Sequence, residues 1–268
     1  MQSYEKLAKK IRITALTACK NSRSSHIGSC LSCIDIMAVL YGGWLRVTPE
    51  SVEDENRDRF ILSKGHAAAA MYATLCVSGF LSDDDMCSYG EGGSSLGGHV
   101  HSHVDGVEVS TGSLGHGLPL GAGMALGMSR AGRTGQVVVL MSDGELNSGA
   151  NWEALMFAAS QKLDNLIAIV DRNRLQAMGS TEDIIPLEPL MPRFEAFGWE
   201  VRRIDGHDHF AVEGALEEGR IHFGKPFVII ADTIKGKGVS FMENEVVWHY
   251  RSPDAQSFAK AVEEIENQ

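Results

Sequence analysis

Two polar residues that could bind a metal ion follow short apolar runs of the sequence. The run at residues 137–141 leads to Asp143 and Gly144, and the run at residues 166–170 leads to Asn173. A carboxylate and an amide oxygen, with no cysteine or histidine beside them, suit a hard cation such as Mg²⁺, which often keeps a phosphate among its ligands. Gly144 allows a ligand to approach the backbone closely. Each residue alone could simply form a turn, but together they predict a magnesium site.

Both runs have the composition of buried parallel strands, because they are short, rich in Val and Ile, and bounded by polar residues. Residues 152–160 between them favour a helix, so the unit is a strand–helix–strand crossover that can join a parallel pair. In open α/β sheets, ligands bind at the carboxyl ends of the strands. The crossover therefore predicts that Asp143 and Asn173 lie together at one edge of a sheet.

Strands and helices alternate along the rest of the chain. Further strands are expected at residues 59–63, 200–204 and 227–231, and further helices at residues 3–20, 33–45, 65–77, 118–130, 188–197, 211–222 and 255–265. Loops are expected at residues 22–29, 48–58, 88–117 and 243–251. This alternation predicts an α/β fold, a three-layer parallel sheet with helices on both faces. The length predicts a single domain over residues 1–268.

Histidines recur in the loop-like stretches: His26 (SSHIGS), His66 (SKGHAA), His99 (GGHVHS) and His249 (VWHYRS). Any one of them alone would more often be a surface or core residue. A neutral imidazole both donates and accepts hydrogen bonds and titrates near working pH, and sugar hydroxyls need such groups for binding and proton transfer. The long loop that carries His99 is of the kind that is usually functional or disordered. These histidines therefore indicate a site that handles hydroxyl groups.

The metal-binding pattern resembles that of a known enzyme family. Asp143-Gly144-Glu145, followed by the 27 residues from Leu146 to Arg172 and then by Asn173, resembles the magnesium–diphosphate motif of thiamine-diphosphate enzymes. The flanking stretches DGELNSGANWEA and LDNLIAIVDRNRLQ are similar to those of transketolases, although Ser142 stands where that family usually has Gly. The resemblance implies thiamine diphosphate and Mg²⁺ as cofactors. It implies Asp143, Asn173 and the Leu175 carbonyl as metal ligands, and as cofactor-binding residues His66, Gly112, Ser113, Leu114, Asp143, Gly144, Glu145, Asn173 and His249.

The same resemblance implies catalytic roles for the four histidines. His26 matches the histidine of the family's SGHPG loop, and His99 matches the one that binds the first hydroxyl of the donor sugar. His66 and His249 match residues that contact the diphosphate, His66 near the reactive carbon of the cofactor and His249 near the substrate. The departures from the family pattern next to these histidines are Ile27, Val100 and Tyr250, in place of Pro, Pro and Gly.

Two glycine-rich stretches complete the resemblance. Residues 110–117 (STGSLGHG) resemble the family's TTGPLGQG loop, which faces the aminopyrimidine and the thiazolium; His116 replaces its Gln, and His101 and His103 match no family histidine. Residues 235–240 (KGKGVS) match the segment that leads to His249. A simple phosphate-binding loop is the competing interpretation of KGKGVS, but it lacks a full P-loop or dinucleotide fingerprint.

The resemblance implies ketol transfer, in which a two-carbon unit passes from a ketose (phosphate) to an aldose (phosphate). The family's activating glutamate lies in a pyrimidine-binding domain that finds no match here, so we expect the first half of a split transketolase. A separate C-terminal, pyrimidine-binding subunit would complete the site, as an α2β2 heterotetramer. The alternatives are half of another thiamine-diphosphate enzyme, such as deoxyxylulose-phosphate synthase or a 2-oxo acid dehydrogenase, or a non-catalytic assembly subunit.

Composition excludes several other classes of protein. The net charge of −11 argues against nucleic acid as a partner. Five cysteines in a long chain do not suggest a disulfide framework, and Cys30 and Cys33 lack the second pair that a zinc site needs. We expect no apolar stretch that approaches the ~20 residues of a membrane helix, and the first residues lack a signal-peptide core. We therefore expect a cytoplasmic protein that does not bind membranes.

Overall fold

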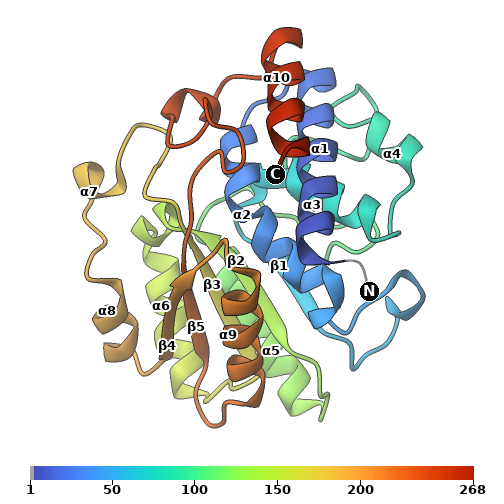
Figure 1. Ribbon diagram of the computed structural model, residues 1–268. Coiled ribbons are helices and arrows are strands. Elements are labelled where there is room, and N and C mark those ends of the chain that lie inside the picture. Colours follow the sequence, from blue (N-terminus) through green and yellow to red (C-terminus); the bar gives the residue numbers. More distant parts are fainter. Residues whose placement is uncertain (1–2) are drawn as a thin grey trace.

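Five parallel strands form the centre of the fold, which is described here by a computed structural model for residues 3–268 (Figure 1). The strands are β1 (Arg59–Leu62), β2 (Val137–Ser142), β3 (Leu166–Arg172), β4 (Glu200–Asp205) and β5 (Phe227–Asp232). They pair in the order β1-β2-β3-β5-β4, and every pair is parallel. The helices are α1 (Tyr4–Ser22), α2 (Ile27–Val39), α3 (Ala68–Val77), α4 (Asp83–Cys87), α5 (Gly117–Arg130), α6 (Gly149–Ser160), α7 (Thr181–Ile184), α8 (Leu190–Ala196), α9 (His209–Ile221) and α10 (Ala255–Glu266).

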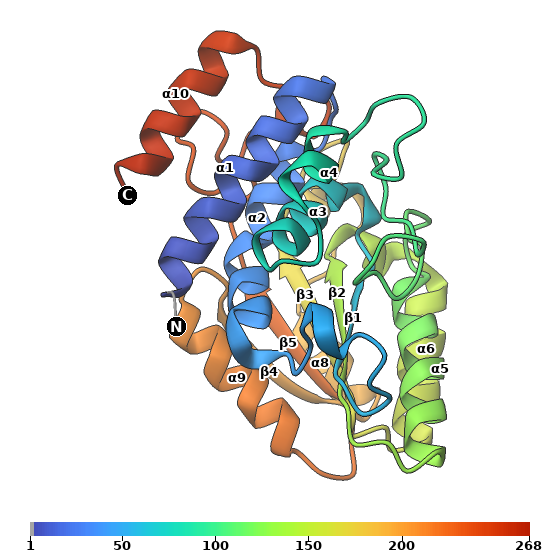
Figure 2. The same cartoon turned by 90° about the vertical axis from the view of Figure 1, so that its right-hand side faces the viewer.

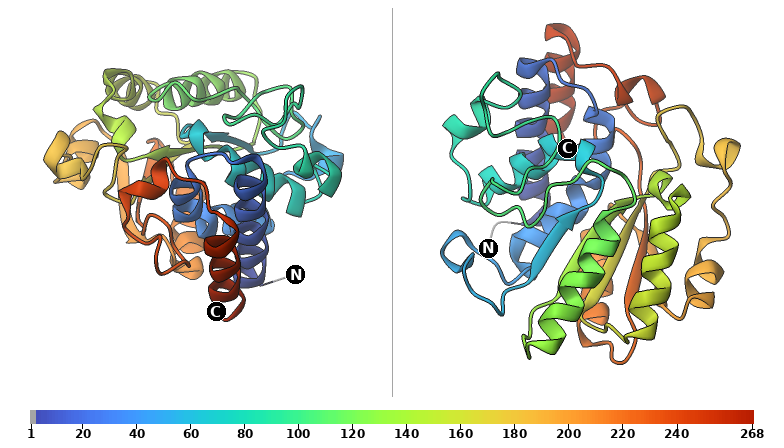
Figure 3. Two further views of the ribbon diagram at one scale, coloured as in Figure 1. Left: turned by 90° about the horizontal axis from the view of Figure 1, so that it is seen from above. Right: turned by 180° about the vertical axis from the view of Figure 1, so that it is seen from behind.

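The strands are buried on both faces, because alternate side chains point into two different cores. Val138 and Leu140 of β2 pack into a core with α1, α2, α3, α9 and α10. Val137 and Val139 of the same strand pack into a second core with α5, α6 and α8. Seen from above, α5 and α6 lie on one side of the sheet and α1 and α10 on the other (Figure 3). This confirms the predicted three-layer α/β fold.

The direction in which successive strands are added to the sheet reverses after β3, next to the crossover that carries the predicted metal ligands. The chain runs from β1 through β2 to β3, with α5 and α6 on one face of the sheet. It then moves to β4 at the edge and returns through α9, on the opposite face, to β5 between β3 and β4. Ligands bind at such switch points in open α/β sheets. The carboxyl ends of β2, β3 and β5 therefore meet where a ligand is expected.

The start of α2 corrects one sequence prediction. We expected a loop at residues 22–29 and a helix from residue 33, but α2 begins at Ile27 and continues through a π-helical turn, Leu40–Trp44. Its first turn contains Gly28 and Ser29, whose small polar character suggested a loop. Both are buried: a Cβ on Gly28 would already touch Trp248, and the Ser29 carbonyl accepts a hydrogen bond from Lys64. Small residues are therefore used here for close packing.

The same helix corrects the expectation that no apolar stretch approaches membrane-spanning length. Within residues 3–268, the segment Ile27–Trp44 is one helix that is long and apolar enough, by length and composition, to cross a membrane. However, 83% of this segment is buried inside the protein. It packs against α1, α3 and α9, so it has the environment of a core helix.

Other elements follow the sequence prediction closely. The segment between α4 and α5 contains no helix or strand, as expected for residues 88–117, and the expected loop at residues 243–251 contains only a short 3-10 turn. The sequence did not predict the short helices α4 and α7. In both Figure 1 and Figure 2 the last helix, α10, lies beside α1, and Lys9 of α1 donates a hydrogen bond to the Glu266 carbonyl (3.0 Å).

Candidate active site

A cavity of about 260 Å³ opens at the carboxyl ends of the strands. Most of the residues that the sequence singled out line it: His26, His66, His99, Gly112, Leu114, Asp143, Gly144, Asn173, Leu175 and His249. They come from the starts of α2 and α3, from the long segment before α5, from the ends of β2 and β3, and from the 3-10 turn Val246–His249. Two predicted residues, Ser113 and Glu145, do not line the cavity.

Neighbouring backbone groups fix the carboxylate of Asp143, which follows β2 and is only 1% exposed. Its Oδ2 accepts hydrogen bonds from the Arg174 backbone N–H (2.6 Å) and from Arg172 Nη1 (3.0 Å). Its Oδ1 accepts one from the Gly144 N–H (2.7 Å). Burial, and then the nearby Asp171 carboxylate, raise the pKa of Asp143. A cation at this carboxylate would offset both effects.

Asn173 lines the same cavity as Asp143. Its Nδ2 donates to Asp171 Oδ1 (3.4 Å), and its Oδ1 accepts from the Leu175 N–H (3.1 Å). The side-chain nitrogen is therefore turned toward Asp171, and the oxygen toward the loop that carries the Leu175 carbonyl. A carboxylate, an amide and a carbonyl oxygen form a donor set that suits Mg²⁺, whose remaining positions are usually filled by water and phosphate. Within residues 3–268 no group of three His, Cys, Asp or Glu side chains could hold a metal by itself.

Buried lysines at the cavity were missed by the sequence analysis. Lys64 pairs with the buried Asp171 carboxylate and donates to the Ser29 carbonyl (2.8 Å). Burial alone would lower the pKa of Lys64, but Asp171 raises it above its usual value, so this ammonium is charged. The segment KGKGVS was recognised, but nothing in its pattern distinguished Lys235 from Lys237 as the lysine that faces inward.

Lys235 is 1% exposed and has no carboxylate as an ion-pair partner within residues 3–268. Its Nζ lies 3.3 Å from the Leu175 carbonyl oxygen and 3.1 Å from His249 Nδ1. Burial, and then the charge of Lys64, lower the pKa of Lys235 to about 8. Buried charges are normally paired, so this ammonium fits a cavity that receives an anion.

The histidines form one cluster around His26. The ring centroid of His26 lies 4.9 Å from that of His249, 5.3 Å from that of His66 and 6.2 Å from that of His99. Burial, followed by the neighbouring histidines and lysines, lowers the pKa of His26 to about 4, that of His249 to about 3, and that of His66 well below its usual value. These three imidazoles are therefore neutral at pH 7 and can both donate and accept hydrogen bonds.

The long segment before α5 is held against the cavity by specific contacts. The buried Tyr72 hydroxyl donates to the His99 carbonyl (3.0 Å) and accepts from the His101 N–H (3.1 Å). Gly112 has a φ of 147°, and a Cβ there would lie 2.7 Å from the His99 ring, so glycine is required at this position. His101 and His103 stack on each other outside the cavity lining.

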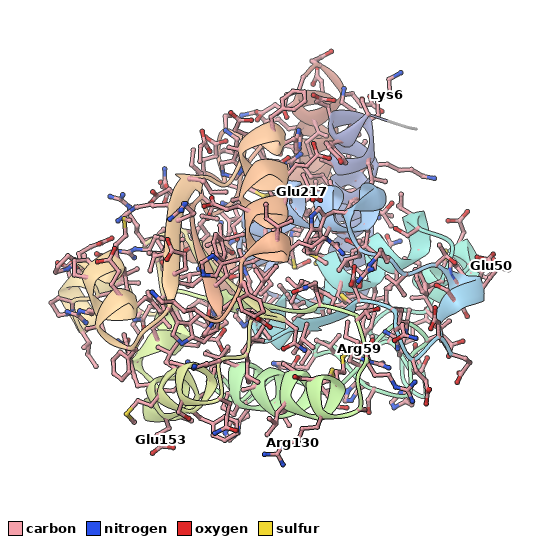
Figure 4. All side chains as sticks on the ribbon, turned by 90° about the horizontal axis from the view of Figure 1, so that it is seen from below. Lys6, Glu50, Arg59, Arg130, Glu153 and Glu217 are labelled. Atoms are coloured by element: carbon pink, nitrogen blue, oxygen red, sulfur yellow. The ribbon has the colours of Figure 1, made fainter. Side chains whose placement is uncertain are left out.

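Glu145 supports the cavity from behind. Its carboxylate accepts hydrogen bonds from Ser63 Oγ (2.7 Å), the Gly115 N–H (2.9 Å) and the Ser142 N–H (2.8 Å). It thereby connects the end of β1, the segment before α5 and the end of β2. Glu153, from the same DGELNSGANWEA stretch, points outward from α6, away from the sheet (Figure 4).

Fold and site together define a thiamine diphosphate-binding domain. Residues 3–262 match the family described as transketolase, thiamine diphosphate binding domain, and the chain belongs to this family. It is 40% identical to a subunit of the apulose-4-phosphate transketolase from Phocaeicola vulgatus, over 99% of this chain and 94% of that protein. It is 37% identical to the 6-deoxy-6-sulfo-D-fructose transketolase subunit SqwG of a Clostridium species, over 91% and 89% of the two chains.

Longer transketolases match over only part of their length. Human transketolase is 36% identical and is covered to 43% by this chain, which is itself covered completely. The crystal structure of transketolase from Campylobacter jejuni superimposes with a TM-score of 0.94 at 32% identity, over 99% of this chain and 43% of that one. The predicted family and the fold of its diphosphate-binding half are thus confirmed.

Proposed function

We propose that this chain, a transferase subunit of the transketolase family, is the diphosphate-binding half of a split transketolase that works with thiamine diphosphate and Mg²⁺. One observation supports this most directly. Three oxygen donors, from Asp143, Asn173 and Leu175, lie in a cavity with the buried ammonium of Lys235. A divalent ion and a diphosphate would satisfy the oxygens and the ammonium together.

The residues that line the cavity would have different roles, according to the chemistry of their side chains. Asp143, Asn173 and the Leu175 carbonyl would hold Mg²⁺, while Lys235, Gly144, His66 and His249 would face the diphosphate. When bound, thiamine diphosphate supplies the nucleophilic carbon that carries a two-carbon unit. His26, which is neutral at pH 7, and the neighbouring His99 would bind hydroxyl groups of the sugar and pass protons to and from them. Leu114 would give the cofactor ring an apolar contact.

The proposed partner is a C-terminal, pyrimidine-binding subunit, in an α2β2 heterotetramer. Two observations support it: three relatives that match over 89% to 96% of their own length are named as subunits, and the chain spans 43% of the solved transketolase from Campylobacter jejuni. Exposed apolar side chains, which are common at protein interfaces, also line the cavity or lie within two residues of a residue that lines it. They are Leu114, Met178, Val247 and Tyr250, and we call them the apolar rim.

The test is reconstitution with the companion chain. We expect little turnover by the isolated chain and restored ketol transfer after mixing, with fructose 6-phosphate, xylulose 5-phosphate, apulose 4-phosphate and 6-deoxy-6-sulfofructose as candidate donors. Full activity of the purified chain alone would refute the split-enzyme proposal. Turnover of pyruvate in place of every ketose would favour a deoxyxylulose-phosphate synthase or a 2-oxo acid dehydrogenase.

The metal assignment has its own test in the same complex. Asp143→Ala removes a buried carboxylate ligand, so Mg²⁺ affinity in the presence of thiamine diphosphate should fall at least about 100-fold, beyond the range of residues that only orient a ligand. Glu153→Ala, on the outer face of α6, is the matched control and should bind as the wild type does. Calorimetric titration measures both. Unchanged affinity of Asp143→Ala would reject the magnesium site.

A further inference from the structure

A buried arginine stands directly behind the proposed metal ligand Asp143. Arg172, the last residue of β3, is 1% exposed. Its Nη1 donates to Asp143 Oδ2 (3.0 Å) and to Thr181 Oγ1 (2.7 Å). Its Nη2 donates to Glu182 Oε1 (2.8 Å), and its Nε to Glu188 Oε1 (3.3 Å). The guanidinium therefore connects the end of the sheet to residues 181–188, the segment that begins with α7.

The hydrogen bonds of Asp143 leave one place for a cation. A carboxylate oxygen offers two lone pairs. Both lone pairs of Oδ2 are used, by Arg172 Nη1 and by the Arg174 N–H. Among the donors of residues 3–268, Oδ1 accepts only the Gly144 N–H, which leaves one of its lone pairs for a cation. Arg172 therefore fixes which oxygen is available and prevents the carboxylate from rotating.

We propose that Arg172 is a positioning residue that holds Asp143 ready for the divalent ion. This inference rests on the proposed function, because it concerns the magnesium site of that function. Arg172 acts through Asp143 and does not itself line the cavity. Its other two carboxylates, Glu182 and Glu188, are about one-third exposed and are stabilised by water, whereas Asp143 is shielded from it. Asp143 thus depends on Arg172 more than they do.

The chain offers a matched control in Arg203. This arginine also binds Glu188, through Nη2 (3.1 Å), but its second partner is Asp232 and it does not contact Asp143. Substituting Arg203 therefore disturbs the same charged network on the side that is remote from the metal ligand. An effect on the metal that is specific to Arg172 cannot come from a general loosening of this network.

The experiment uses the chain in complex with its companion chain and titrates Mg²⁺ by calorimetry at saturating thiamine diphosphate. For Arg172→Gln and Arg172→Met we expect the Kd for Mg²⁺ to rise about 10- to 100-fold, as for other residues that orient a metal ligand. The kcat at saturating Mg²⁺ should stay within about threefold of the wild type, since the ion restores the geometry once bound. Arg172→Lys keeps one donor for Asp143 and should lie between. Arg203→Gln should bind Mg²⁺ as the wild type does.

The possible outcomes test the role of Arg172 separately from the proposed function. Mg²⁺ binding by the wild type, with the same affinity in Arg172→Gln and Arg172→Met, would overturn the role of Arg172 and leave the proposed function intact. An equal loss in Arg203→Gln would also overturn it, because the effect would then belong to the network. Absence of Mg²⁺-dependent binding in the wild type would overturn the proposed function and this inference with it. Thermal unfolding and near-UV circular dichroism show which variants are folded; should Arg172→Gln not fold, Arg172→Met decides.

Discussion

The oxygens that we propose as metal ligands are held in place by hydrogen bonds within the protein. Asp143 is fixed by two backbone N–H groups and Arg172, and Asn173 is fixed by the Leu175 N–H and by Asp171. Pre-oriented ligands lower the ordering cost of binding. The positions of these oxygens therefore follow from local hydrogen bonds at the ends of β2 and β3, and a variant in their partners should affect affinity more than the fold.

The low pKa of His26 predicts how the folding stability of the protein depends on pH. A histidine in the unfolded chain titrates near pH 6.5, whereas the pKa of His26 in the folded protein is about 4. As the pH falls below 6.5, the unfolded chain takes up a proton that the folded chain does not, so folding stability is present above pH 6.5 and is lost toward pH 4. His26→Gln removes this titrating group, so the folding stability of the variant should fall less steeply as the pH is lowered.

Urea unfolding midpoints of the isolated chain at pH 7.5, 6.0 and 5.0 measure this difference. The exposed His103, which lies outside the cavity lining, provides the control substitution His103→Gln, which should follow the wild type. If the midpoint of His26→Gln fell with pH as steeply as that of the wild type, the low pKa of His26 would be contradicted.

The crossover between β2 and β3 was predictable because the sequence features that specify it lie within one short stretch of the chain. Two apolar runs, a helix-forming stretch and a polar residue after each run suffice to place Asp143 and Asn173 together. Lys235 and Ser29 were not predictable in this way. Their inward orientation depends on β5 being inserted between β3 and β4 and on α2 beginning at Ile27, and both are consequences of tertiary packing.

Glu145 shows a different limit of sequence reasoning. The motif predicts Glu145 as a cofactor-binding residue, but it does not line the cavity, and its carboxylate accepts hydrogen bonds from Ser63, Gly115 and Ser142. Ser63 and Gly115 are far from Glu145 in the sequence, and only the packed structure shows that they supply its donors. The motif therefore identifies Glu145 as important, and the hydrogen bonds of its carboxylate show that it connects three neighbouring segments.

The buried pair between Lys64 and Asp171 joins the segment after β1 to β3, and it should be costly to break. Both side chains are fully buried, and Asp171 also accepts hydrogen bonds from Ser32 and Thr233. Lys64→Met removes the charge and leaves the carboxylate uncompensated, which typically costs about 3–5 kcal/mol. Lys260→Ala, in an exposed i,i+4 pair with Glu264, should cost at most about 0.5 kcal/mol.

Equilibrium urea unfolding at pH 7 compares the two variants. A loss of less than about 1 kcal/mol for Lys64→Met would mean that Asp171 is satisfied by its hydroxyl donors alone.

The cavity and the apolar rim lie at the same edge of the sheet, where the strands have their carboxyl ends. Met178 is 80% exposed and follows Gln176 and Ala177, which line the cavity. Phe223 is 88% exposed but lies after α9 and before β5, at the amino-terminal edge of the sheet. The two side chains are therefore comparable in exposure and differ in which edge of the sheet they occupy.

This contrast gives a prediction about assembly. If the companion chain covers the cavity, Met178→Asp places a charge in the interface, where an unpaired buried charge is costly, and should weaken association at least about 10-fold. Phe223→Asp, at the opposite edge, should leave association unchanged. Sedimentation velocity across a range of concentrations of the mixed chains measures both. Equal association of Met178→Asp and the wild type, or a loss confined to Phe223→Asp, would place the companion chain on another face, and the apolar rim would then need a different occupant.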